Sequence, residues 1–353
     1  MLYCINNLKK GRNNAGSKAP ADVYEIAKEY GALEIKFYEP KLRKKVFLTR
    51  ITALPVGIQN WNRLNKKVKA GDWVLLQHPN ENLVVANYYI DIVKRKNVHF
   101  IALIHDLDSL RKSLTINDKR LRKRNFKADT LLLKKCDYII CHNEYMKKYL
   151  LEQGFDKNRI VCLEIFDYLH KSKLIKTKSK EKSVAIAGNL IEGKCGYLYK
   201  LCIRNNLPFF IHLFGPNYEG PVKKSFLMYH GSCNPDELPE KLEGSFGLVW
   251  DGTEIDKCAG NAGEYIKYNN PHKCSLFLAS NMPVIIWKHA ALAEFVVKNG
   301  VGITIDSLLE IGEAIDKISN QEYEKMVENT KKIGEKLRDG HYLKSALAQI
   351  KME

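Results

Sequence analysis

The chain has 353 residues, more than the roughly 250 to 300 at which a single hydrophobic core usually stops growing, so two domains are expected. A composition of 45% hydrophobic and 27% charged residues excludes a disordered or fibrous chain. The net charge of +17 indicates an anionic partner, but it does not choose among nucleic acid, an anionic membrane surface and anionic substrates such as nucleotide diphosphates.

The cysteines and the hydropathy pattern indicate a cellular compartment. Nine cysteines, an odd number, are scattered without a Cys-x-x-Cys pair, which is typical of reduced thiols. The first residues show no long apolar core with a cleavage site, and no stretch reaches the roughly 18 apolar residues of a membrane span. We therefore expect a cytoplasmic protein, neither secreted nor integral to a membrane, and leave peripheral contact with the inner membrane face open.

The first half alternates short apolar runs with segments of helical period, which is typical of strand-helix-strand units and a parallel sheet. The expected strands are 2–6, 32–38, 72–79, 98–106, 137–143 and 159–167. The expected helices are 21–30, 84–96 and 144–153, and the segment 39–69 has no assigned element.

The densest basic segment is 111–127, RKSLTINDKRLRKRNFK. It contains a single aromatic residue, Phe126, so it lacks the stacking platform of a protein that binds single-stranded nucleic acid. A solvated helix face and a patch for a membrane surface or a lipid-linked acceptor both stay open. No nucleic-acid partner is expected.

A lysine-rich segment, 170–182, divides the chain and is interpreted as an interdomain linker. After it the alternation restarts, with expected strands at 183–189, 209–215, 225–231, 247–252, 283–287 and 301–305. The expected helices are 197–205, 236–243, 273–278, 290–298, 308–318 and 321–350.

These patterns predict an α/β fold with two Rossmann-like domains facing a central cleft, and ligands at the carboxyl ends of the strands. The predicted domains are an N-terminal acceptor-side domain, 1–169, the linker 170–182, and a C-terminal donor-binding domain, 183–325. A C-terminal helix, 326–353, could pack back on the first domain.

The segment 246–304 carries the most informative motifs. It contains FGLVWDG and then EYIKYNNPHKCSLFLASNMPVIIW, a strand, a loop and a helix whose start carries a lysine. It resembles the donor-binding half of the GT-B glycosyltransferases, and within them the bacterial group of galactofuranosyltransferases and adhesin glucosyltransferases. IHD at 104–106, AGN at 187–189 and NPDELPEKL at 234–242 also match. The resemblance covers most of the chain but is not specific for the sugar.

A nucleotide-sugar site must neutralise a diphosphate leaving group, either with a metal or with a lysine or arginine together with helix N-terminal amides. Lys273 follows Asn-Asn-Pro at the start of a predicted helix, so its ammonium and the free N–H groups could meet one phosphate. A solvated lysine is the alternative. His272 is expected to be structural or exposed.

Other donor-binding candidates follow the strands of the second half. Gly188 and Asn189 form the turn that faces the donor diphosphate in the resembled enzymes, Tyr229 could contact the nucleotide, and Asp251 could meet the donor sugar. For each, an ordinary turn or strand-end role is the alternative, and Trp250 is expected in the core. Gly16 and Ser17, in the loop after the first strand, are candidates because small residues let a ligand approach the backbone closely.

His105 and Asp106 end an apolar strand, where a cleft residue is expected. An inverting transferase needs a general base for the acceptor hydroxyl, and Asp106 is the first candidate and His105 the second. Helix capping by Asp106 or Asp108 is the alternative. The glutamate pair of many retaining relatives is not clearly present, because Glu264 lies nine residues before Lys273 and Glu294 follows the PVIIW strand.

The leading hypothesis is therefore an inverting hexosyl transfer from a UDP-sugar, with galactofuranose as the first guess, to a saccharide acceptor in cell-surface glycan synthesis. No metal is expected, because the only Asp-x-Asp match, 106–108, lies outside the donor-binding half. The alternatives are a glucosyltransferase that extends a protein-linked glycan and a non-catalytic nucleotide-sugar-binding module. A lipid-linked acceptor and a homo-oligomer are left open.

Overall fold

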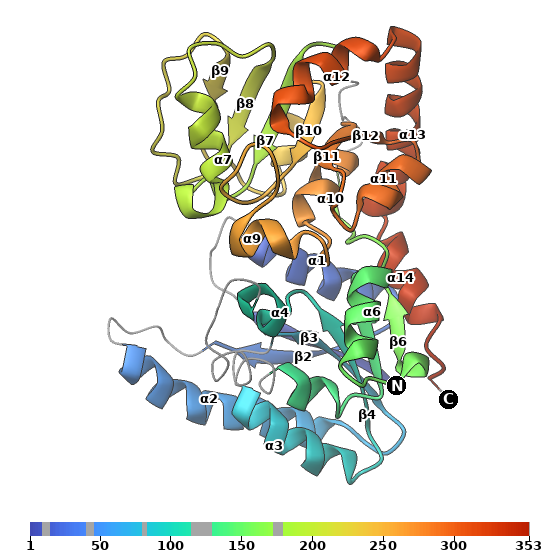
Figure 1. Ribbon diagram of the computed structural model, residues 1–353. Coiled ribbons are helices and arrows are strands. Elements are labelled where there is room, and N and C mark those ends of the chain that lie inside the picture. Colours follow the sequence, from blue (N-terminus) through green and yellow to red (C-terminus); the bar gives the residue numbers. More distant parts are fainter. Residues whose placement is uncertain (9–14, 40–45, 80–82, 114–128, 172–178, 353) are drawn as a thin grey trace. The chain divides into compact units, whose positions relative to one another are not determined.

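The computed structural model describes residues 1–8, 15–39, 46–79, 83–113, 129–171 and 179–352 (Figure 1). The chain forms two compact units. One comprises Met1–Arg12, Pro20–Leu163 and Leu343–Glu353, and the other comprises Asn13–Ala19 and Glu164–Tyr342. Most of the basic segment 111–127 and of the linker 170–182 lies outside the described residues.

The first unit is built on a six-stranded parallel sheet in the order β2-β1-β3-β4-β5-β6. Its strands are β1 (Leu2–Leu8), β2 (Leu33–Tyr38), β3 (Trp73–His78), β4 (His99–Ile104), β5 (Tyr138–Cys141) and β6 (Ile160–Cys162). Its helices include α1 (Ala15–Glu29), whose residues up to Ala19 belong to the other unit, α2 (Val46–Lys67), α3 (Leu83–Lys94), α4 (Asp108–Ser113) and α6 (Glu144–Glu152), with a short 3₁₀ turn at Lys157–Arg159.

The central strands are apolar and buried on both faces, as expected for a parallel sheet covered by helices. The register aligns Cys4 of β1 with Leu75 of β3, and Leu75 with Ile101 of β4. Because the strands are parallel and in register, His78 and Ile104 end side by side at one edge of the sheet.

Helix α2 lies in a segment to which the sequence assigned no element. Its buried face carries Trp61 and Leu64, three residues apart, and the Trp61 ring stacks on Tyr89 of α3 at 6.3 Å between centroids. Figure 1 shows α2 and α3 running side by side. Pro55 within the helix and the many polar residues weakened the periodic signal, since proline normally ends a helix.

The second unit has a six-stranded parallel sheet in the order β12-β11-β10-β7-β8-β9. Its strands are β7 (Ser183–Ala187), β8 (Phe210–Phe214), β9 (Leu227–Tyr229), β10 (Phe246–Val249), β11 (Val284–Trp287) and β12 (Gly302–Ile305). Its helices are α7 (Glu192–Cys202), α8 (Leu238–Lys241), α9 (Gly260–Tyr265), α10 (His272–Ala279), α11 (Ala293–Lys298), α12 (Ile311–Lys317) and α13 (Asn320–Arg338), with a 3₁₀ turn at Leu308–Glu310.

The strand order places a topological switch between β7 and β10. From β7 the chain proceeds outward through β8 and β9, then returns to β10 on the other side of β7 and proceeds through β11 and β12. In doubly wound sheets the crevice for a ligand opens at the carboxyl ends of the strands at such a point. The loops after β7 and β10 are therefore where a ligand site is expected.

The predicted single helical segment 321–350 is wrong in one respect, because the structure has two helices there. α13 begins with a capping box between Ser319 and Glu322 and ends at Arg338, and α14 spans His341–Ala348. Gly340 between them has a φ of 72°, a left-handed conformation that glycine adopts readily and that ends helices. The continuous helical periodicity concealed this break.

Candidate functional site

Two glycine turns meet at the carboxyl edge of the second unit's sheet. Gly188 follows β7 with a φ of 134°, and Gly215 follows β8 with a φ of 144°. The Gly188 amide donates to the carbonyl of Phe214 at 3.0 Å, and a Cβ on Gly215 would lie 1.8 Å from the Gly188 carbonyl oxygen. Only glycine at 215 permits this approach, so the two turns form one rigid backbone platform.

The predicted donor contacts Asn189 and Tyr229 belong to the same platform. Gly188 and Asn189 are exposed at the end of a fully buried strand. The Asn189 side-chain oxygen accepts from the side chain of Asn217 at 2.9 Å. The Tyr229 hydroxyl donates to the Gly215 carbonyl at 2.8 Å, so this side chain braces the turn after β8. A contact between Tyr229 and a nucleotide stays a prediction.

Lys273 and Asp251, 22 residues apart in the chain, form a buried ion pair beside the topological switch. Lys273 lies in the first turn of α10 and Asp251 follows β10. The Lys273 ammonium donates to Asp251 Oδ1 at 2.9 Å and to the carbonyl of Trp250 at 2.8 Å. The two side chains are 12% and 11% exposed, so the alternative of a solvated lysine is wrong. Trp250 is in the core, as predicted.

The electrostatics keep Lys273 charged. Burial lowers the pKa of its ammonium, but the Asp251 carboxylate and the neighbouring Cys195 raise it by more, so the net pKa is raised. Among the described residues two acceptors take two of the three ammonium protons. Asp251 and the Trp250 carbonyl therefore hold the Lys273 ammonium in a fixed position at the N-terminus of α10, beside the β10 end of the sheet.

His272, next to Lys273, is partly buried, with its Nε2 atom enclosed. Burial and the charge of Lys18 lower the pKa of its imidazole to about 4, so the ring is neutral near pH 7. The ring packs against Tyr168 and Phe166, with centroids 5.0 and 6.2 Å away. This environment agrees with the structural role predicted for His272.

In the first unit His105 is held by Gln77, a residue that the sequence did not single out. The Gln77 amide nitrogen donates to the Pro20 carbonyl at 3.1 Å, which directs its oxygen toward His105 Nε2 at 2.6 Å. An amide oxygen only accepts, so His105 Nε2 carries the proton. Gln77 could have been identified because it is a polar residue near the end of an apolar strand beside β4.

Asp106, the predicted base, shares an arginine with Asp108. Arg111 donates to Asp106 Oδ2 at 3.1 Å and to Asp108 Oδ1 at 3.0 Å. Asp108 is the first residue of α4, a capping role for Asp106 or Asp108 stays a prediction, and both carboxylates are about one-third exposed, at 35% and 32%. The arginine fixes the direction of the Asp106 carboxylate while leaving part of it accessible to a substrate.

The predicted loop around Gly16 and Ser17 is wrong as a loop, because α1 begins at Ala15 and includes both residues in its first turn. The helix continues through Pro20, which the sequence analysis placed before the helix. Pro20 is the sixth residue of α1 and removes one hydrogen bond inside the helix. Because proline normally starts or ends a helix, the sequence pattern placed the helix start after Pro20. Residues 13 and 14 of the predicted loop lie outside the described residues, and a ligand contact at Gly16 or Ser17 stays a prediction.

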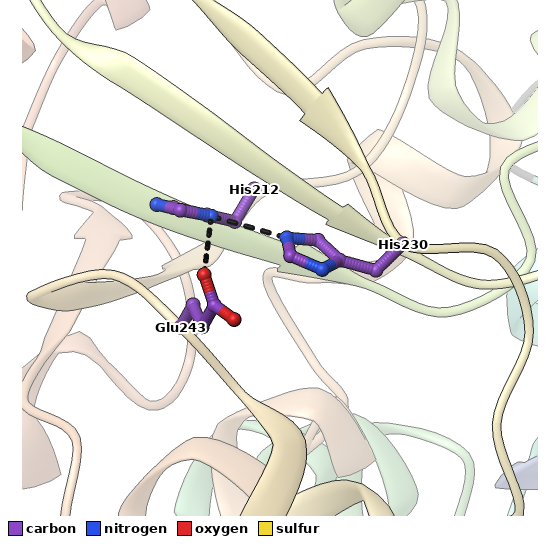
Figure 2. Close-up of side chains that lie close together, drawn as sticks. All are labelled: His212, His230 and Glu243. Atoms are coloured by element: carbon purple, nitrogen blue, oxygen red, sulfur yellow. Dashed lines mark hydrogen bonds and ion pairs between the residues drawn. The ribbon is translucent and has the colours of Figure 1, made fainter.

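The donor candidates and the residues that could hold a metal form different groups. Among the described residues the ligand atoms of His212, His230 and Glu243 lie within 4.8 Å of one another (Figure 2). No sequence spacing indicated this group, because the three residues come from separate loops and strands of the second unit.

Family models match both halves of the chain. The N-terminal domain of the glucosyltransferase 3-like proteins matches residues 2–165, and the C-terminal domain matches residues 184–350.

The chain belongs to the glucosyltransferase 3-like family.

Two curated relatives of this glucosyltransferase 3-like protein cover nearly the whole chain. It is 31% identical to the beta-1,6-galactofuranosyltransferase WbbI of Escherichia coli (strain K12), over 99% of this chain and 98% of the relative. It is 24% identical to glucosyltransferase 3 of Streptococcus gordonii, over 95% of this chain and 93% of the relative. The protein is a glycosyltransferase, as the sequence predicted.

The fold agrees with this assignment. The crystal structure of Anabaena Alr3699/HepE in complex with UDP matches with a TM-score of 0.61, at 11% identity and over 99% of this chain and 98% of that one. The two parallel six-stranded sheets and this likeness confirm the predicted two-domain α/β fold of the GT-B class. Among the described residues no helix is both long and apolar enough to cross a bilayer.

Proposed function

We propose that this enzyme transfers a hexose from a UDP-sugar to a saccharide acceptor in cell-surface glycan synthesis, with galactofuranose as the first candidate. The relative with 31% identity along almost the entire chain is a galactofuranosyltransferase, and this observation carries the choice of sugar. UDP is the ligand in the HepE complex, which supports a uridine nucleotide as the donor. The acceptor is proposed to be a lipid-linked or protein-linked saccharide.

The donor diphosphate is proposed to bind at the carboxyl edge of the second unit's sheet without a metal. Lys273 supplies a buried positive charge, and its third ammonium proton is the one proposed to reach a phosphate oxygen. Gly188 and Asn189 supply exposed backbone at the adjacent strand end, where close approach to an anion is sterically possible. Asp251 holds the lysine in place, which fixes the charge before the donor arrives.

The reaction is proposed to invert the anomeric centre in one displacement. Asp106 would take the proton of the acceptor hydroxyl as the hydroxyl oxygen attacks the anomeric carbon and UDP leaves. The partial exposure of Asp106 and its fixed direction toward Arg111 support this assignment. His105, held by Gln77, is the second candidate.

Glucosyl transfer to a glycan on a protein is the second candidate function. The family models describe glucosyltransferase 3-like proteins, and the Streptococcus gordonii relative is itself a glucosyltransferase 3. The identity to that relative is 24%, lower than the 31% to the galactofuranosyltransferase, so we rank glucose second.

A donor titration tests the proposal directly. In the presence of a chelator, UDP is expected to raise the melting temperature, because a ligand that binds only the native state stabilises it by mass action. UDP-galactofuranose is expected to release UDP in the presence of simple alkyl glycosides faster than UDP-glucose or UDP-galactopyranose does. The product, examined by NMR, should show an anomeric configuration opposite to that of the donor.

Other results would contradict parts of this proposal. If no uridine nucleotide shifted the melting temperature, the proposal that the donor is a UDP-sugar would be wrong. A shift that required magnesium or manganese would contradict metal-independent donor binding, and faster turnover of UDP-glucose would favour the second candidate.

The assignment of Asp106 as the general base predicts a large loss of activity when its carboxylate is replaced by an amide. Asp106→Asn is expected to lower kcat by about 10²- to 10⁴-fold, the usual contribution of a general base, while the Kd for UDP stays unchanged. Steady-state kinetics and calorimetric titration measure the two quantities separately.

Asp108→Asn is the matched control, because Asp108 accepts from the same arginine at nearly the same distance, 3.0 against 3.1 Å. It should retain most of kcat. Equal losses in the two variants would show that the carboxylates act only by holding Arg111, and an unaltered kcat in Asp106→Asn would remove this residue from the mechanism.

A further inference from the structure

Two imidazoles and a carboxylate meet on one side of the second unit's sheet, apart from the Lys273 and Asp251 pair. His212 lies in β8, His230 directly follows β9, and Glu243 lies between α8 and β10. Figure 2 shows the carboxylate of Glu243 and the ring of His230 both directed at the same nitrogen of His212. The His212 Nδ1 atom is 3.1 Å from His230 Nε2 and 3.5 Å from Glu243 Oε2.

These separations resemble the edges of a tetrahedral metal site. With metal-ligand bonds of about 2.1 Å, two ligand atoms of a tetrahedral zinc lie about 3.4 Å apart. The two distances at His212 bracket this value, and all three ligand atoms lie within 4.8 Å of one another. A small adjustment of the exposed carboxylate would complete three corners of the tetrahedron.

The surrounding fold positions the two imidazoles in advance. The His230 amide donates to the carbonyl of Leu213 at 2.9 Å, so its backbone is tied to β8. The His230 ring stacks on Phe214, with centroids 4.3 Å apart and planes 5° from parallel, and Phe210 packs against His212 at 4.9 Å. The His212 side chain is 13% exposed, and that of Glu243 is 58% exposed.

We propose that His212, His230 and Glu243 bind one Zn²⁺ ion, through His212 Nδ1, His230 Nε2 and a carboxylate oxygen, with water as the fourth ligand. Two imidazoles and one carboxylate suit zinc, whereas magnesium and calcium prefer sites made of oxygen atoms. The ion would join β8, the end of β9 and the segment before β10. This role is structural and separate from the metal-free donor binding proposed above, so each can fail without the other.

Metal titration of the tag-free, full-length protein after chelator treatment tests this site. We expect one Zn²⁺ per chain by calorimetry, and one Co²⁺ whose visible absorption is that of a tetrahedral nitrogen and oxygen site. Glu243→Gln, at an exposed position that should not disturb folding, is expected to weaken binding more than about tenfold, and His212→Ala more than about 100-fold, since even loss of an outer partner of a metal ligand commonly costs 10- to 100-fold.

His289→Ala is the matched control. His289 also lies near a carboxylate, Asp306, at 3.5 Å, but it is 59% exposed and is not part of the three-ligand group. This variant should bind Zn²⁺ as the unaltered protein does. The proposal is overturned if the unaltered protein binds no Zn²⁺, if Glu243→Gln and His212→Ala both keep its affinity, or if Co²⁺ gives the near-ultraviolet charge-transfer band of cysteine thiolates.

Discussion

Replacing Lys273 with alanine is expected to lower the free energy of unfolding by about 3 to 5 kcal/mol, because the change leaves the Asp251 carboxylate buried without its counter-charge. If the ammonium also binds a donor phosphate, the Kd for UDP should rise about 10- to 100-fold, the equivalent of one charge-assisted hydrogen bond. Urea denaturation followed by circular dichroism measures the first quantity, and calorimetric titration with UDP measures the second.

Two further variants separate stability from binding. In Lys273→Met/Asp251→Leu both charges are removed together, so the loss of stability should be much smaller than in Lys273→Ala. UDP binding should still be weak in this double variant, and binding at the unaltered affinity would remove Lys273 from the donor site.

Lys288→Ala is the control for the loss of an ordinary ion pair. Lys288 pairs with Asp306 at 3.1 Å, but the two side chains are 58% and 52% exposed. Its removal should cost no more than about 1 kcal/mol. A similar small cost in Lys273→Ala would contradict the assignment of a buried, strongly coupled pair.

Acidification from pH 7 to pH 4 is expected to destabilise both units through one histidine in each. Burial lowers the pKa of His142 in the first unit and of His272 in the second, each to about 4. Between pH 6.5 and 4 the unfolded chain binds these protons and the folded chain does not, so stability is lost as the pH falls through this window. Each histidine contributes up to about 3 kcal/mol to this loss.

A variant at His272 tests whether this histidine causes the pH-dependent loss of stability in the second unit. His272→Phe keeps an aromatic ring beside Tyr168 and Phe166 but cannot bind a proton. Its free energy of unfolding, measured by urea denaturation at pH 7, 5.5 and 4.5, should fall less steeply with pH than that of the unaltered protein. The exposed His289→Ala serves as the control and should leave the slope unchanged, whereas an unchanged slope in His272→Phe would refute the proposed linkage.

The fold class followed from local patterns. Buried strands such as β3 and β4 are continuous apolar runs, and they alternate with segments of helical period, so the two parallel sheets were predictable. The same patterns failed for α2, whose Pro55 contradicts the local rule, and at Gly340, where a single left-handed residue divides a continuous periodic segment. At α2 the packing of side chains outweighed the local sequence signal, and at Gly340 one backbone conformation did.

The candidate site was predictable where residues follow a strand end or open a helix. Asp251, Gly188 and Asp106 were identified because the carboxyl ends of parallel strands meet at one edge of each sheet, and Lys273 because it opens a helix in the segment that resembles the donor-binding half of the family. The ion pair of Lys273 with Asp251, the orientation of His105 by Gln77, and the group of His212, His230 and Glu243 were decided by the tertiary structure alone. These contacts join residues 18 to 31 positions apart through side-chain directions, burial and sheet register, and no periodicity in the chain encodes those distances.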